Sequence, residues 1–203
     1  MCGASAALAT STVLPDYRDK AADVAIVVVA CNAIATLAMI AYPPLCALIG
    51  FDPQATGVML GATIHDVAQV AGAGYAVSDA VGNNAVIVKL FRVFLLLPVV
   101  IGVGWYFAGS RGERRAVRPP VPMFAVAFLG LVVINSLGIL PAFVVTVIGE
   151  VSRWGLLLAI GALGLMTSFA DIGRAGWRHL AVMFAVSALI LVIATGGLML
   201  IRL

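Results

Sequence analysis

Charge is scarce in this chain of 203 residues. Only 10% of the residues are Asp, Glu, Lys or Arg, whereas 63% are hydrophobic and the mean hydropathy is +1.15. Soluble globular domains carry about 25% charged residues, so this composition excludes an ordinary soluble fold. The net charge of +3 comes from arginines in short loops between apolar runs. That placement is typical of membrane topology, and we therefore expect no nucleic-acid partner.

Residues that bind metals and nucleotides are equally few. The chain has two histidines and three cysteines, and the cysteines lie in apolar surroundings without pairing or metal-ligand spacing. The sequence contains no Walker lysine loop, no His-Glu-x-x-His zinc motif and no Gly-x-Ser-x-Gly elbow. We therefore expect no metal, no cofactor and no enzymatic activity. Any transport would be driven by an ion gradient or by the gradient of the solute itself.

Long uncharged runs predict an all-α, polytopic helical membrane protein. A helix needs about 20 apolar residues to cross the hydrocarbon core. We expect residues 1–203 to form a single transmembrane domain, in which a small-residue helix over 1–14 precedes about six spans. The spans are expected near residues 24–50, 59–78, 85–108, 121–148, 154–170 and 180–201.

Two basic loops set the expected orientation. The first holds four arginines between residues 111 and 118, and the second holds Arg174 and Arg178. By the positive-inside rule both loops are cytoplasmic. The segment 59–78 either spans the bilayer or re-enters it, and the weak acidic bias of the loop at 16–23 favours a span.

The polar residues of the second expected span are the main functional signal. On a continuous helix Gly61, His65, Gln69 and Gly72 share one face, and Asp66 lies beside it. Each ionisable group at membrane depth costs about 2.5–3.5 kcal/mol, so such groups tend to mark pathways or binding sites. A histidine beside a carboxylate suits proton coupling near neutral pH. The alternative is that these side chains only bond a neighbouring helix; their clustering favours function.

Other polar positions leave two interpretations open. Lys89 and Arg92 share a helix face, and they either reach the membrane interface or form a buried pair that binds an anion or neutralises Asp66. Asn135 and Ser136 interrupt an apolar run, and the residues at 161–168 loosen the next one. These interruptions serve either close helix packing or a discontinuous helix that faces solute.

Several blocks together resemble a known family. They are residues 2–7, 61–70, 88–92, 95–98, 135–141 and 164–167. The blocks are similar to those of the UPF0324 (YeiH-like) family of bacterial inner-membrane proteins, whose members are often labelled sulfate exporters. The resemblance covers essentially the whole chain. It departs from the family at Asp66, where the family usually has Glu, and in length, because family members are substantially longer.

The resemblance implies a secondary transporter related to cation/proton antiporters and bile-acid symporters. Such folds use inverted repeats whose broken helices cross at the midplane. By this analogy one broken helix would contain Cys2, Gly3 and Ser5, and its partner would contain Gly164 and Thr167. Because of the difference in length, we expect the chain to be the carboxy-terminal part of a larger transporter or a shortened form of one.

The leading hypothesis is a transporter, and more specifically an exporter, of a small anion such as sulfate or another sulfur oxyanion. The expected partners are the lipid bilayer, the anion and protons or sodium. The residues assigned to ion coupling or solute binding are His65, Asp66, Gln69, Lys89, Arg92, Asn135 and Ser136. The alternative is a truncated, non-transporting membrane protein that assembles with a partner, and a single repeat would build a two-repeat site only as a homodimer.

Overall fold

The computed structural model describes residues 3–108, 123–138, 140–166 and 177–201, and helices are the only regular elements in these ranges. The helices are α1 (Gly3–Val13), α2 (Lys20–Ile49), α3 (Pro53–Thr63), α4 (Val67–Val77), α5 (Asp79–Phe94), α6 (Leu96–Ala108), α7 (Met123–Ser136), α8 (Ala142–Met166) and α10 (Trp177–Ile201). Three described stretches are long and apolar enough to cross a membrane: Lys20–Ile49, Asp79–Phe107 and Leu180–Ile201. The predicted all-α, helical membrane class is confirmed, whereas the number of spans and the inverted repeat stay predictions.

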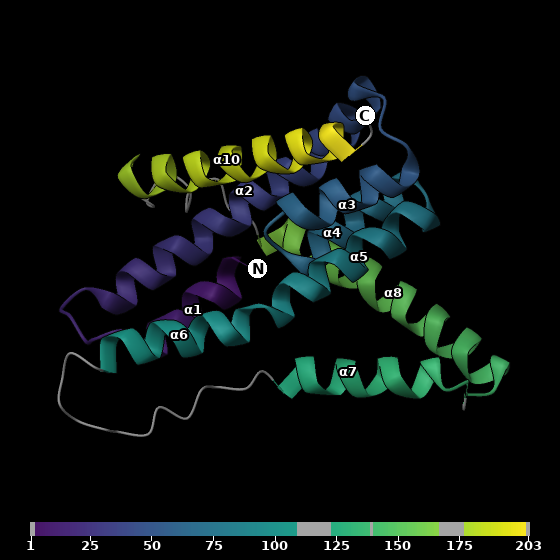
Figure 1. Cartoon of the computed structure of the whole chain (residues 1–203), viewed down its shortest axis with the longest axis horizontal. Coiled ribbons are helices and arrows are strands. Elements are labelled where there is room, and N and C mark those ends of the chain that lie inside the picture. The colour runs from purple at the N-terminus through teal and green to yellow at the C-terminus, as the bar shows by residue number, and fades with distance from the viewer. Residues whose placement is uncertain (1–2, 109–122, 139, 167–176, 202–203) are drawn as a thin grey trace.

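The centre of the molecule is formed by α3, α4 and α5, which pack closely on one another (Figure 1). The long helix α2 contacts α3 and α4, and α10 lies across both α2 and α3. The short α1 packs between α2 and α6. Helices α7 and α8 extend away from this centre, although α8 still contacts α4 at one end (Figure 1).

The turn from α2 into α3 follows directly from the local sequence. Gly50 ends α2 in the left-handed conformation (φ 76°), and its N–H donates to the carbonyls of the last turn. Asp52 then caps α3 by accepting a hydrogen bond of 2.7 Å from the N–H of Ala55, and Pro53 occupies the first helical position. The chain therefore reverses after α2 and brings α3 back toward the middle of the molecule.

The predicted span at 59–78 is wrong as a continuous helix. The structure has two half-helices instead, α3 and α4, separated by Ile64, His65 and Asp66. The carboxylate of Asp66 starts a new helix, and the backbone of Ile64 is extended (φ −67°, ψ 140°). The discontinuity thus falls in the middle of the expected span, whereas broken helices were expected near residues 2–5 and 164–167.

The predicted division between 121–148 and 154–170 also differs from the structure. The chain turns at Gly138 (φ 64°) and Pro141, between α7 and α8. Helix α8 then continues through residues 149–153, where a loop was expected, because Glu150 and Arg153 are good helix formers and do not interrupt it. Gly164 lies in the last turn of α8, which ends at Met166, and the predicted broken helix around Gly164 and Thr167 stays a prediction.

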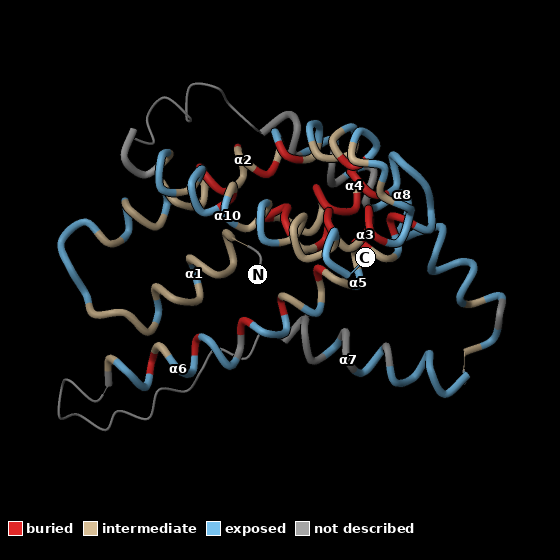
Figure 2. The backbone as a smooth tube through the Cα atoms, turned by 45° about the horizontal axis from the view of Figure 1, so that its top comes forward, coloured by how far each residue is buried: buried red, intermediate tan, exposed pale blue. Residues whose placement is uncertain are grey.

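The buried core lies where α2 to α5 meet. Met59, Leu60, Ile64, Val70 and Val81 are completely buried there. Figure 2 shows buried positions concentrated on α3, α4, α5 and the facing part of α2, whereas the residues of α7 and α8 whose burial is described are nearly all exposed. Exposed apolar side chains on α7 and α8 are suited to contact with lipid.

A glycine in α3 allows this helix to approach α5 closely. A Cβ atom on Gly61 would overlap the carbonyl oxygen of Ala85 and would lie 2.8 Å from the Cβ of Val88, both on α5. Substitution Gly61→Ala should therefore force α3 and α5 apart and cost about 1–3 kcal/mol of stability. We expect a lower midpoint of thermal unfolding in detergent.

The matched control is Gly102→Ala in α6, where an added Cβ would meet no atom within 4 Å. The higher helix propensity of alanine should leave the stability of this variant unchanged or slightly raised. Equal midpoints for Gly61→Ala and the control would contradict the close α3–α5 packing.

Candidate functional site

The candidate site is the interruption between α3 and α4, which is defined here as the break and consists of Ile64, His65 and Asp66. Ending one helix and starting another exposes carbonyls at the end of α3 and N–H groups at the start of α4. Backbone groups that are buried away from water must be satisfied by protein groups. The side chains around the break do so, and they include most of the residues that the sequence singled out.

Asp66 caps the amino end of α4. Its carboxylate accepts hydrogen bonds from the backbone N–H of Ala68 (3.0 Å) and Gln69 (3.4 Å). A carboxylate is favoured here by these hydrogen bonds and by the positive end of the helix dipole. The first amides of α4 are thus already bound to a side chain of the protein.

Two cations from α5 bind the carboxyl end of α3. The Lys89 ammonium donates to the carbonyl of Ile64 at 2.5 Å, and an Nη atom of Arg92 donates to the carbonyl of Gly61 at 3.3 Å. Positive charge is favourable at the negative end of a helix dipole. Lys89 is completely buried, so its side chain does not reach the membrane interface.

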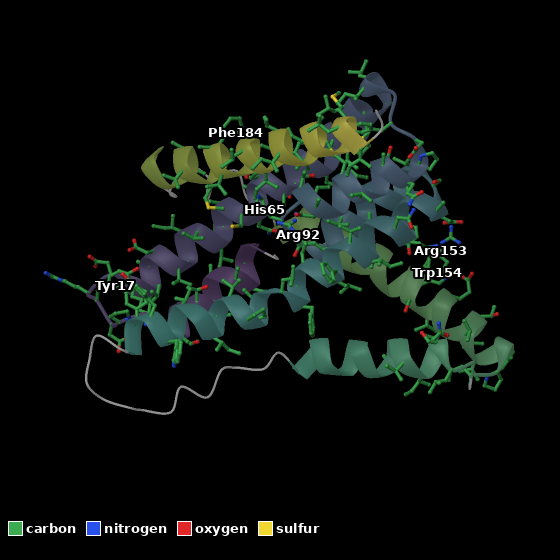
Figure 3. The ribbon with its side chains drawn as sticks, viewed as in Figure 1. Tyr17, His65, Arg92, Arg153, Trp154 and Phe184 are labelled. Carbon is green, nitrogen blue, oxygen red and sulfur yellow. The ribbon has the colours of Figure 1, made fainter. Side chains whose placement is uncertain are left out.

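His65 connects the break to two further helices. Its carbonyl accepts a hydrogen bond of 2.9 Å from the N–H of Gly3 in α1. Its ring Nε2 lies 2.7 Å from the Oγ of Ser187 in α10. His65 is only 6% exposed, and Figure 3 shows it in the middle of the molecule near Arg92 and beneath α10.

Gln69 extends from α4 toward α2. Its Nε2 donates to the Oγ1 of Thr36 at 2.8 Å and lies 3.2 Å from the Oδ1 and 3.3 Å from the backbone carbonyl of Asn32. These oxygens fix the amide orientation, because the opposite orientation would set two carbonyl oxygens against its Oε1. The Oε1 is buried and has no hydrogen-bond partner among the described residues. It is therefore an acceptor suited to a bound water, cation or solute donor.

The structure brings together only part of the predicted set. His65, Asp66, Gln69, Lys89 and Arg92 gather at the break, although His65 and Gln69 extend to different helices and not along one shared face. Asn135 and Ser136 lie exposed at the far end of α7, away from the break (Figure 1). Gly3 contacts the break and Ser5 lies on α1, whereas Cys2 and Thr167 fall outside the described residues.

Sequence reasoning missed three side chains at this site. Asn32 and Thr36 are four residues apart in the otherwise apolar α2, and that spacing was a usable signal for a polar helix face. The sequence carries little signal for Ser187, because a lone serine in an apolar span is common at helix contacts. Within the described part of the chain, no group of three His, Cys, Asp or Glu side chains converges to hold a metal.

Comparison with known proteins assigns the family. The family model for conserved hypothetical protein 698 matches residues 1–183. A UPF0324 membrane protein of Chlorobaculum tepidum is 43% identical over 202 residues. The chain belongs to the UPF0324 family of membrane proteins. It is accordingly a multi-pass protein of the bacterial inner membrane.

Other UPF0324 relatives show the same pattern of coverage. The UPF0324 membrane protein TauZ of Paracoccus pantotrophus is 41% identical, and a UPF0324 protein of Rhizobium meliloti is 38% identical. These two alignments cover 98% of this chain and the Chlorobaculum one covers 97%, but they include only 56–60% of the relatives. The chain thus spans somewhat more than half the length of these relatives. No solved structure matches the chain.

The contact between Lys89 and Ile64 gives a testable prediction. Lys89→Met removes the donor from the Ile64 carbonyl and should cost about 1–3 kcal/mol, the typical cost of leaving a buried acceptor without a partner. We expect a lower unfolding midpoint in detergent. The matched control is Arg153→Met, since Arg153 is an exposed cation of α8 that lies away from the break. Equal losses in the two variants would show that Lys89 does not stabilise the break.

Proposed function

We propose that the protein is an ion-coupled secondary transporter of a small anion, and that the break is its coupling site. The observation that carries this proposal is a discontinuous helix whose interruption is buried and polar. Discontinuous helices at membrane depth line solute and ion sites in secondary transporters. Buried ionisable residues at such a place indicate function by default.

The groups at the break are suited to binding a coupling ion. His65 and Asp66 can each exchange a proton, and the carboxylate of Asp66 and the Oε1 of Gln69 are oxygen ligands of the kind that a sodium ion prefers. Both a proton and a sodium ion thus fit the chemistry of the side chains. The coupling ion would bind beside the carboxyl end of α3 and the amino end of α4, where small movements of either half-helix change its ligands.

The charge balance at the break supports an anion as the solute. Lys89 and Arg92 bring two positive charges to the break and Asp66 brings one negative charge, so positive charge is in excess among these three side chains. In a medium of low dielectric constant this excess attracts a small anion even though both cations already bind carbonyls. Sulfate is the first anion to test, because the sequence blocks resemble proteins labelled sulfate exporters.

Asp66→Asn is the sharpest test of this function. Asparagine caps a helix as well as aspartate does, so α4 should keep its start while the negative charge is lost. In proteoliposomes containing the full-length protein, we expect wild type to move labelled sulfate along an imposed pH or sodium gradient. The variant should lose the gradient-driven part of this flux by about tenfold or more, the scale of a lost proton-transfer group.

Asp79→Asn is the matched control, because Asp79 lies exposed in the first turn of α5, away from the break. Its flux should equal that of wild type. Full coupled flux in Asp66→Asn would contradict the assignment of the break. If wild type moves none of a panel of small anions under either gradient, the proposed function itself is wrong.

A further inference from the structure

Ser187 is a buried serine that links α10 to the break. It is 4% exposed, and its Oγ lies 2.7 Å from two atoms, the Nε2 of His65 and the carbonyl oxygen of Met183. Both distances are those of short hydrogen bonds. The contact joins residues 122 positions apart, so the packing of α10 on α3 decides it rather than local sequence.

The hydroxyl of Ser187 has a single proton, and the two contacts need two. The Met183 carbonyl can only accept, so the proton of Ser187 lies between Oγ and that carbonyl. The proton between Oγ and Nε2 must then come from His65. The opposite tautomer would turn the Ser187 proton to Nε2 and leave two acceptor oxygens 2.7 Å apart with no proton between them.

We infer that Ser187 is a positioning residue that holds His65 in its Nε2–H tautomer, so that Nδ1 is the nitrogen that binds and releases the coupling proton. This inference rests on the proposed function and assigns its coupling ion as a proton. The Nδ1 has no hydrogen-bond partner among the described residues, and its lone pair is therefore available to a proton. Because Ser187 contacts the ring and not the solute, its effect on transport passes through His65.

The groups that surround His65 set the conditions for this proton. From α5, Lys89 and Arg92 bring positive charge to the same break, and Asp66 is the adjacent carboxylate. The facing part of α2 contributes the thiol of Cys31 and neutral polar side chains, and α10 contributes the neutral Ser187. The α1 side contributes backbone and the positive charge of the amino terminus. A proton at Nδ1 adds a further positive charge beside Lys89 and Arg92, which repel it. A bound anion would offset this repulsion, so binding of the proton and binding of the anion favour each other.

Nitrogen-15 NMR of the full chain in lipid tests the tautomer directly. His179→Gln leaves His65 as the only histidine, and correlation with the ring carbons distinguishes its two nitrogens. At a pH where the ring is neutral, we expect the Nε2–H form to exceed the Nδ1–H form by about tenfold, as one hydrogen bond would give. Lowering the pH should add the second proton at Nδ1.

Three serine variants separate positioning from general packing. Ser187→Ala should reduce the tautomer ratio severalfold, because the acceptor for Nε2–H is gone. Ser187→Thr keeps a hydroxyl and should keep the ratio. Ser152→Ala, at an exposed serine of α8, is the matched control and should behave as wild type. A predominant Nδ1–H form in wild type, or an unchanged ratio in Ser187→Ala, would overturn the inference.

Flux measurements give a second readout. In proteoliposomes Ser187→Ala should lower the maximal rate of pH-driven anion flux about tenfold while the KM for the anion stays the same, as expected when a partner that orients a functional histidine is removed. A raised KM at an unchanged maximal rate would mean that Ser187 contacts the solute, and the positioning role would be wrong. If wild type moves no anion, the proposed function fails, whereas the NMR ratio still decides the tautomer.

Discussion

The structure depends on one constraint, which is that a helix interrupted in the buried interior must have its free backbone groups satisfied by protein. At the break, charged side chains satisfy most of these backbone groups. Asp66 binds the first amides of α4, Lys89 and Arg92 bind carbonyls at the end of α3, and the N–H of Gly3 binds the carbonyl of His65. The charges match the signs of the two helix dipoles. The costs of burying Lys89 and of partly burying Asp66 are therefore offset by their hydrogen bonds to these helix ends.

The same arrangement divides the polar residues into two kinds. Asp66, Lys89 and Arg92 bind the ends of the half-helices. They would act on a solute through their electrostatic field and not by binding it directly. The ring of His65 and the Oε1 of Gln69 still have acceptor capacity among the described contacts. Helix α10 contacts the His65 ring through Ser187, and α2 orients the Gln69 amide through Asn32 and Thr36. A movement of α10 or α2 would thus shift the side chains of His65 or Gln69 at the break.

The helical membrane class could be predicted from composition, and the polar residues in the apolar run at 61–74 correctly indicated where polar side chains gather in the structure. The break could not be located by periodicity, because His65, Gln69 and Gly61 also fit one face of an uninterrupted helix. A better signal was the spacing of Asp66 and Gln69, an N-cap residue followed three positions later by Gln, which marks a helix start. The division of α7 and α8 was missed because hydropathy cannot distinguish a charged loop from a helix that carries Glu150 and Arg153.

The proposed role of the break depends on the buried contact between the Lys89 ammonium and the Ile64 carbonyl. Solid-state NMR can measure this contact in lipid. The chain has a single Ile-His peptide bond, so labelling isoleucine carbonyls with carbon-13 and histidine with nitrogen-15 selects the Ile64 carbonyl. A nitrogen-15 label on lysine Nζ then supplies the other partner of the contact. The 2.5 Å hydrogen bond predicts strong dipolar coupling over a carbon–nitrogen distance of about 3–4 Å. No detectable coupling between the Ile64 carbonyl and lysine Nζ would contradict a break closed by this cation.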